Sequence, residues 1–116
     1  MIVIGWLAGP GPAALCLDNL AEADFGPDVV SVVMASRAGA NEIAHSRGSL
    51  ASAAWTDLPA RLAALGLRAN AAPYTEAVAR GGVFLAVDVA DAEIAAAAAE
   101  MLGDAQASDV RTLPEA

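Results

Sequence analysis

Two polar side chains in the middle of the chain have the types and spacing that could support chemistry. Glu42 and His45 stand three residues apart, so on a helix they would share a face, as in E-x-x-H metal sites. The chain contains one such pair and a single histidine, whereas a structural zinc ion needs four ligands. A solvated loop histidine is the commoner arrangement. We therefore expect no metal and keep Glu42 and His45 as a candidate polar site.

Two serines follow the histidine and raise the question of nucleophilic catalysis. His45, Ser46 and Ser49 lie on one short segment, and no carboxylate is evident to orient the histidine. Residues so close in sequence rarely align as a nucleophile and its base. The sequence therefore predicts no catalytic residue. It leaves enzymatic activity open and favours its absence.

Aromatic and charged side chains elsewhere could form an interface or line a ligand pocket. These candidates are Trp6, Trp55, Tyr74, Glu76, Arg80 and Phe84. Glu76 and Arg80 also have the spacing of an ordinary surface pair on a helix. A tryptophan that proved to be exposed would indicate an interface.

A glycine- and proline-rich turn precedes the first predicted helix. Residues 9–12 read Gly-Pro-Gly-Pro and lead from a strand to a helix N-terminus, where anions can bind. The segment has neither a dinucleotide nor a Walker pattern, and its prolines lack the amide donors that such loops use. We interpret it as a turn and predict no cofactor.

The candidate residues must be positioned by alternating strands and helices. Apolar alternation predicts strands over 1–7, 29–34, 83–89 and 110–113. Helical spacing with start and stop residues predicts helices over 12–25, 57–65, 73–81 and 91–102. Asp91 has the position of an N-cap, and Gly81 and Gly103 follow helices.

This order predicts an α+β fold with two β-α-β units and a four-stranded antiparallel sheet, in a ferredoxin-like arrangement. The first and third strands should be central, since right-handed crossovers place them side by side. We expect a single domain over 1–116 with a helical insertion at about 35–81. Two helices should cover one face of the sheet. The other face, with Ile2, Ile4 and Trp6 or their opposite set, should stay open unless a partner, a second subunit or residues 35–70 cover it.

Composition and charge narrow the classes of partner. The 116 residues are 57% hydrophobic and carry a net charge of −8. Nucleic acid and anionic membranes are disfavoured, because phosphate contacts need a basic surface. The turn at 9–12 breaks the N-terminal apolar run, so we expect no membrane span. Cys16 cannot form an internal disulfide, so we expect a buried thiol in a soluble, cytoplasmic protein.

The last third of the chain resembles a known family. Gly66-Leu67, the run APYTEAVARGGVFLAVDV over 72–89, a capped helix to Leu102-Gly103 and Ser108-Asp109-Val110-Arg111 are similar to the general stress protein 17M-like domain, a bacterial heat-induced stress family. The resemblance implies a stress-associated role and carries no established enzymatic activity. Many members have long glycine-rich apolar stretches in the middle, where this chain has a short polar segment.

A second resemblance concerns the long excursion between the second and third strands. It is similar to P-II signalling proteins, which bind nucleotides in clefts between subunits, although their basic phosphate-binding loop is not visible here. Three hypotheses follow. We favour a non-enzymatic stress-associated protein that self-associates as a homo-oligomer (a dimer) or docks on a protein partner through the open sheet face. The alternatives are a small-ligand sensor with residues 35–70 as its lid or signalling loop, and an enzyme that uses His45.

Overall fold

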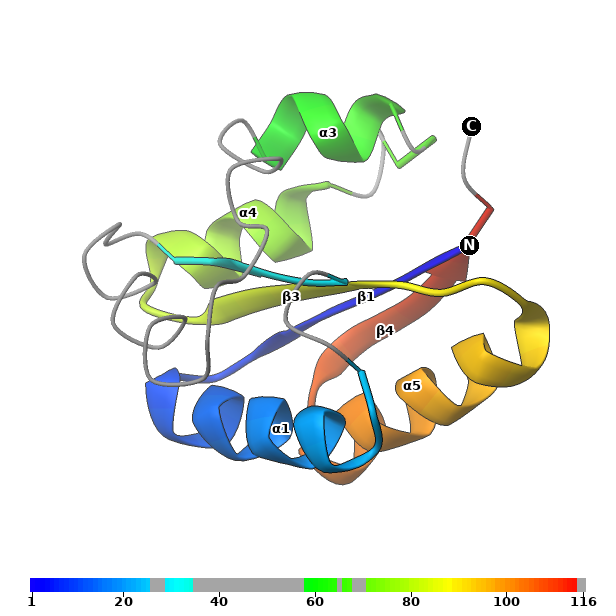
Figure 1. The fold of residues 1–116 in the computed structure, drawn as a ribbon. Coiled ribbons are helices and arrows are strands. Elements are labelled where there is room, and N and C mark those ends of the chain that lie inside the picture. Colours follow the sequence, from blue (N-terminus) through cyan, green and yellow to red (C-terminus); the bar gives the residue numbers. More distant parts are fainter. Residues whose placement is uncertain (26–28, 35–57, 65, 68–70, 115–116) are drawn as a thin grey trace.

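The computed structural model describes residues 1–25, 29–34, 58–64, 66–67 and 71–114 (Figure 1). Within them the chain forms one sheet with helices above and below it (Figure 1). The elements in chain order are β1 (Ile2–Leu7), α1 (Pro10–Glu22), β2 (Val30–Val33), α3 (Leu58–Ala64), α4 (Ala72–Ala79), β3 (Val83–Asp88), α5 (Ala92–Asp104) and β4 (Ser108–Leu113).

The sheet has four strands in the order β2-β3-β1-β4, and all its pairings are antiparallel. The central pair runs from Ile2 opposite Asp88 to Leu7 opposite Val83. Each half of the chain contributes a strand, a helix and a strand, which is a ferredoxin-like α+β arrangement. The prediction of this fold class, with the first and third strands in the centre, is confirmed. It succeeds because both central strands are apolar on both faces, as strands covered on two sides must be.

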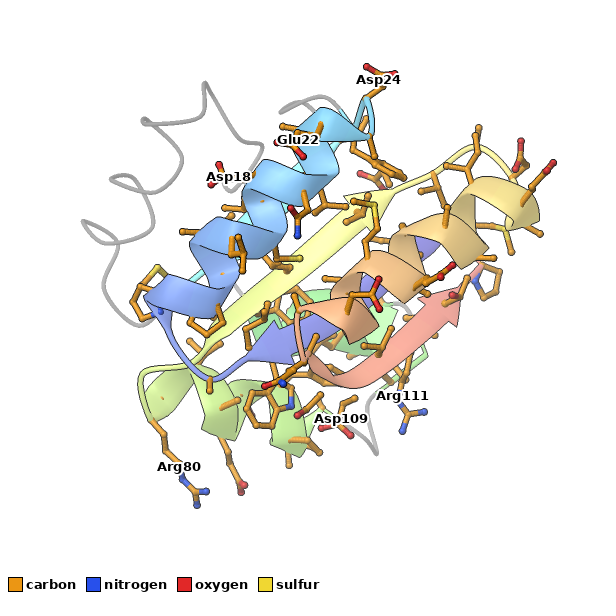
Figure 2. All side chains as sticks on the ribbon, turned by 90° about the horizontal axis from the view of Figure 1, so that it is seen from below. Asp18, Glu22, Asp24, Arg80, Asp109 and Arg111 are labelled. Atoms are coloured by element: carbon orange, nitrogen blue, oxygen red, sulfur yellow. The ribbon has the colours of Figure 1, made fainter. Side chains whose placement is uncertain are left out.

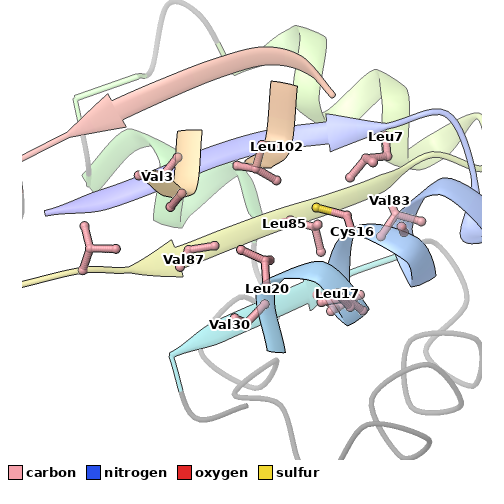
Figure 3. Packing of buried hydrophobic residues seen from close by; sticks show 14 of the residues in the cluster. Val3, Leu7, Cys16, Leu17, Leu20, Val30, Val83, Leu85, Val87 and Leu102 are labelled. Carbon is pink, nitrogen blue, oxygen red and sulfur yellow. The ribbon is translucent and has the colours of Figure 1, made fainter. Parts of the chain in front are cut away.

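The lower face of the sheet packs against α1 and α5 (Figure 1). Val3 and Leu7 of β1 belong to one buried cluster with Cys16 and Leu20 of α1 and Leu102 of α5 (Figure 3). Each of these side chains is at most 1% exposed. Alternate residues of β1 therefore belong to this layer, in keeping with the two-residue period of a strand. The prediction of a buried Cys16 is confirmed.

The upper face is covered by α3 and α4, so it is not open (Figure 1). Of the alternatives expected for this face, cover by the chain itself is the one found, with α3 coming from within residues 35–70. Ile2 is 1% exposed and Ile4 is fully buried. Leu62 of α3 and Tyr74 of α4 pack against them, together with Phe84 of β3. The burial of this apolar surface in the chain itself removes the reason to expect a partner on this face.

The start of α5 and the end of α4 follow local rules, whereas the end of α5 does not. Asp91 caps α5, since its Oδ1 accepts a hydrogen bond from the amide of Ile94 at 2.9 Å. Gly81 follows α4 with a φ of +97°, a conformation that glycine adopts at low cost. However, α5 does not end before Gly103 as predicted but continues to Asp104. The preceding alanine-rich turns favour helix strongly enough to carry one glycine.

Candidate functional site

The upper layer is fastened to the edge strand β4 by a small group of polar and aromatic side chains. The hydroxyl of Tyr74 on α4 donates to the main-chain oxygen of Asp109 at 2.6 Å. The indole Nε1 of Trp6 on β1 donates to the Asp109 carboxylate at 2.8 Å. The rings of Tyr74 and Phe84 meet edge to face, with centroids 5.7 Å apart. We call Trp6, Tyr74, Phe84 and Asp109 the aromatic latch.

A β-bulge places Asp109 where both donors can reach it. Ile4 pairs with Arg111 and Trp6 with Ser108, so two residues of β4 face the single residue Gly5 of β1. Asp109 has a φ of +52°, a left-handed conformation that aspartate tolerates better than most residues. A Cβ on Gly5 would lie 3.3 Å from Val110 Cγ2, so glycine allows the close approach of the bulged strand.

The electrostatics of the latch suit a structural role. Burial raises the pKa of the Tyr74 phenol, the nearby Arg111 lowers it in part, and the Asp109 charge raises it. The hydroxyl therefore stays protonated at neutral pH and donates its hydrogen bond. The latch thus holds α4 on the sheet.

The candidate residues from the sequence fall into three groups. Trp6, Tyr74 and Phe84 come together in the latch, where Tyr74 and Phe84 are buried and Trp6 is half-buried. Glu76 on α4 and Arg80 directly after it lie outside the latch, and Arg80 projects away from Asp109 and Arg111 (Figure 2). The others, Glu42, His45 and Trp55, lie outside the described residues, as does most of the proposed lid at 35–70. Because Tyr74 and Phe84 are enclosed by the chain, they cannot contact a partner.

The described residues contain neither a cluster of metal ligands nor a membrane-spanning helix. No group of three or more histidine, cysteine, aspartate or glutamate residues in the described ranges is arranged to hold a metal ion. None of the helices in the part of the chain that the structure describes is long and apolar enough to cross a membrane.

The lower layer carries a surface that the sequence interpretation missed. A groove of about 540 Å³ lies between the segment that follows the C-terminal end of α1 and the exposed side of α5. Its lining joins apolar and acidic side chains: Ala23, Phe25, Glu93, Ile94, Ala97, Glu100, Met101 and Asp104. A smaller hollow with Asn19 and Glu22 shares Ala23, Met101 and Asp104 with it and extends it along α1. We call this continuous surface the α1–α5 groove.

The floor of the groove is apolar and partly open to solvent. Ile94 is 40% exposed, whereas most large apolar side chains of the described residues are buried. Phe25 and Met101 are packed against the lower core and only partly buried, and Ala23 and Ala97 are small. The small alanine side chains leave the groove open between bulkier neighbours.

The rim of the groove is acidic. Neither α1 nor α5 contains a basic residue. Carboxylates also follow the exposed side of α1, at Asp18 and Glu22, with Asp24 just beyond its end, while the labelled arginines lie on the far side of the molecule (Figure 2). A pattern in the sequence could have revealed this surface. Glu93, Ala97, Glu100 and Asp104 recur at intervals of four, three and four, which is the spacing of one helix face.

Comparison of the chain with protein-family models, with curated proteins and with solved structures finds no match.

Proposed function

We propose that the protein acts by docking on a protein partner through the α1–α5 groove, without catalysis of its own. The observation that carries this proposal is an apolar floor left accessible between two helices, with Ile94 at 40% exposure. Apolar surface that is gathered in a groove and surrounded by polar groups is characteristic of interaction sites. The docking surface in this proposal is therefore the lower layer and not the sheet face.

Charge favours a different protein over a second copy as the occupant of this groove. Two copies that met through the same face would bring Glu93, Glu100 and Asp104 of one against those of the other. Such like-charge contacts oppose association. The net charge of −8 adds to this repulsion. Of the two modes of action expected from the sequence, partner docking is the one that this surface supports.

A stress-associated role is part of the proposal on the strength of the resemblance of residues 66–111 to the general stress protein 17M-like family. A role in stress fits a protein whose work is to bind another protein. The small-ligand sensor stays a prediction, since its lid falls mainly outside the described residues.

Site-specific photocrosslinking in the cells that make the protein would test the proposal. A benzoylphenylalanine at Ala97 places the reactive group in the groove, and one at Ala72 places it on the exposed surface of α4. We expect a discrete protein adduct from position 97 and none from position 72. The substitution Ile94→Asp should remove the adduct, whereas Leu15→Asp, at another exposed apolar residue of the lower layer, should leave it intact. Absence of an adduct from position 97, or equal adducts from both positions, would contradict the proposal.

A further inference from the structure

We propose that the occupant of the α1–α5 groove is a cationic amphipathic helix of the partner protein. This inference rests on the proposed function and specifies the chemistry of the partner. It follows from the arrangement of the carboxylates, from their position on the two helices and from the lack of a strand edge among the lining residues of the groove.

The carboxylates and apolar residues of α5 form two adjoining stripes. Glu93, Glu100 and Asp104 share one helix face, and Ile94 and Met101 lie seven residues apart on the neighbouring one. Glu22 of α1 extends the acidic rim across the smaller hollow. A bound helix could thus place apolar side chains on Ile94 and Met101 and basic side chains on the rim.

Several of these carboxylates occupy positions that disfavour negative charge. Glu100 and Asp104 are four residues apart on α5, where like charges repel. Glu22, Glu100 and Asp104 also stand in the C-terminal parts of their helices, where the helix dipole opposes an acidic side chain. Neither helix has a basic residue in its last turn that could offset this negative charge. Cationic side chains of a partner would offset both the repulsion between carboxylates and their unfavourable contact with the helix dipole. Carboxylates at these positions therefore lower the stability of the isolated chain but favour the complex.

The lining of the groove favours a helix over an extended segment. An extended peptide gains affinity by adding to the edge of a sheet, but this groove is lined by residues of α1, α5 and the segment after α1. A helix satisfies its own main-chain hydrogen bonds and so needs no strand edge from the groove. The alanines at 23 and 97 allow the aliphatic stems of lysine or arginine to lie close to the surface. In helix-in-groove recognition, apolar anchors lie three, four or seven residues apart, and Ile94 and Met101 are seven apart.

A designed peptide can serve as the probe. A fluorescent lysine–leucine helix of about 14 residues has roughly the length of α5, and a peptide with glutamate in place of lysine is its control. We expect the basic peptide to bind the full chain with an affinity that falls as salt is raised, and the acidic peptide not to bind. Failure of the basic peptide to bind, or binding that salt leaves unchanged, would overturn the inference.

Paired variants locate the binding site. The double variant Glu93→Gln with Glu100→Gln should weaken binding about 3- to 10-fold, since it removes two exposed ion pairs. The control makes the same two-unit change in net charge away from the groove, with Glu76→Lys on the exposed surface of α4. The control should change affinity less than twofold. Equal weakening in both variants would show a nonspecific attraction and overturn the inference.

Thermal unfolding of the same variants separates a functional role from a structural one. The repulsion between Glu100 and Asp104 that is lost should offset the favourable contact of Glu93 with the N-terminal dipole of α5, so the unfolding midpoint of Glu93→Gln with Glu100→Gln should stay nearly unchanged while its binding falls. A lower midpoint together with the loss of binding would mean that the carboxylates support the fold, against the inference. An Ile94-dependent crosslink that survives the Glu93→Gln and Glu100→Gln changes would leave partner docking intact and reject only its cationic character.

Discussion

Tyr74 donates its hydroxyl hydrogen to the main-chain oxygen of Asp109 across 2.6 Å, and this bond joins α4 to the bulge of β4. The two residues come from the insertion and from the last strand, which do not neighbour each other in sequence. The bond therefore fixes the covering layer of the sheet to an edge strand, and its loss should lower the stability of the whole upper layer.

Removal of the hydroxyl tests this bond. Tyr74→Phe should lower the free energy of unfolding by about 1 kcal/mol, because the Asp109 carbonyl loses a partner while the ring packing on Phe84 stays. Tyr74→Leu, which also removes the ring, should cost about 3 kcal/mol or more. Urea unfolding followed by circular dichroism gives both values.

A double-mutant cycle of Tyr74→Phe with Trp6→Phe should show coupling, since both donors hold Asp109; strictly additive losses would argue against a shared latch.

Two glycines should respond in opposite directions to alanine. A Cβ on Gly82 would lie 2.7 Å from the main-chain oxygen of Ala77 and 2.9 Å from that of Leu7, so Gly82→Ala must displace backbone. We expect a loss of about 3 kcal/mol or more. Gly103 is inside α5, and a methyl group there would meet no neighbouring element of the described chain within 4 Å, so Gly103→Ala should add about 0.5–1 kcal/mol. Thermal unfolding compares the two directly, and a neutral Gly82→Ala would refute the close approach.

Alkaline pH should destabilise the fold through Cys16. Burial raises the pKa of its thiol from 9.0 to about 11, so the unfolded chain loses this proton first. Above pH 9 the unfolded state binds fewer protons, and the free energy of unfolding falls as pH rises toward 11, by at most about 2–3 kcal/mol. The chain has no lysine and one tyrosine, Tyr74, whose raised pKa acts in the same direction.

The control for this pH dependence is Cys16→Ala. Its absolute stability should be lower because of the lost core contacts, but its decline between pH 9 and 11 should be shallower than that of the natural chain. Chemical denaturation at several pH values measures both slopes. Parallel curves for the two proteins would mean that the thiol does not contribute.

The start of α5 depends on one side chain. Asp91→Ala removes the oxygen that accepts from the amide of Ile94, and we expect a loss of about 1 kcal/mol. Asp91→Asn keeps an acceptor at the same position and should restore most of the stability. Hydrogen exchange at the first turn of α5 gives a local measurement. Similar protection in Asp91→Ala and Asp91→Asn would show that the cap has little effect.

The course of the strands and most helices could be predicted because local patterns determine them. β1 and β3 are apolar on both faces, and Asp91 and Gly81 are ordinary start and stop residues. The cover on the upper face could not be predicted in the same way, since it depends on how Leu62 and Tyr74 meet residues far away in the chain. Local sequence patterns do not determine such tertiary contacts.

The two candidate surfaces differ in how much the sequence revealed. Trp6, Tyr74 and Phe84 were candidates for an interface or a ligand pocket, but Tyr74 and Phe84 are core because α4 packs on the upper face of β3. Asp109 was not singled out, since its role comes from a bulge that shifts the register of β4 by one residue. The α1–α5 groove was open to prediction, because the repeated acids of α5 and the lack of basic residues on both helices are visible in the sequence.

The position of β1 in the centre of the sheet has a consequence for the order of folding on the ribosome. Its partner β3 is made only after residues 8–82, and β4 later still, so the apolar run of β1 emerges long before anything can pair with it. The nascent chain must pass through an interval in which this strand is uncovered, which is when chaperones bind. Closure of the sheet therefore comes late in synthesis, and until then an unpaired apolar strand is open to aggregation.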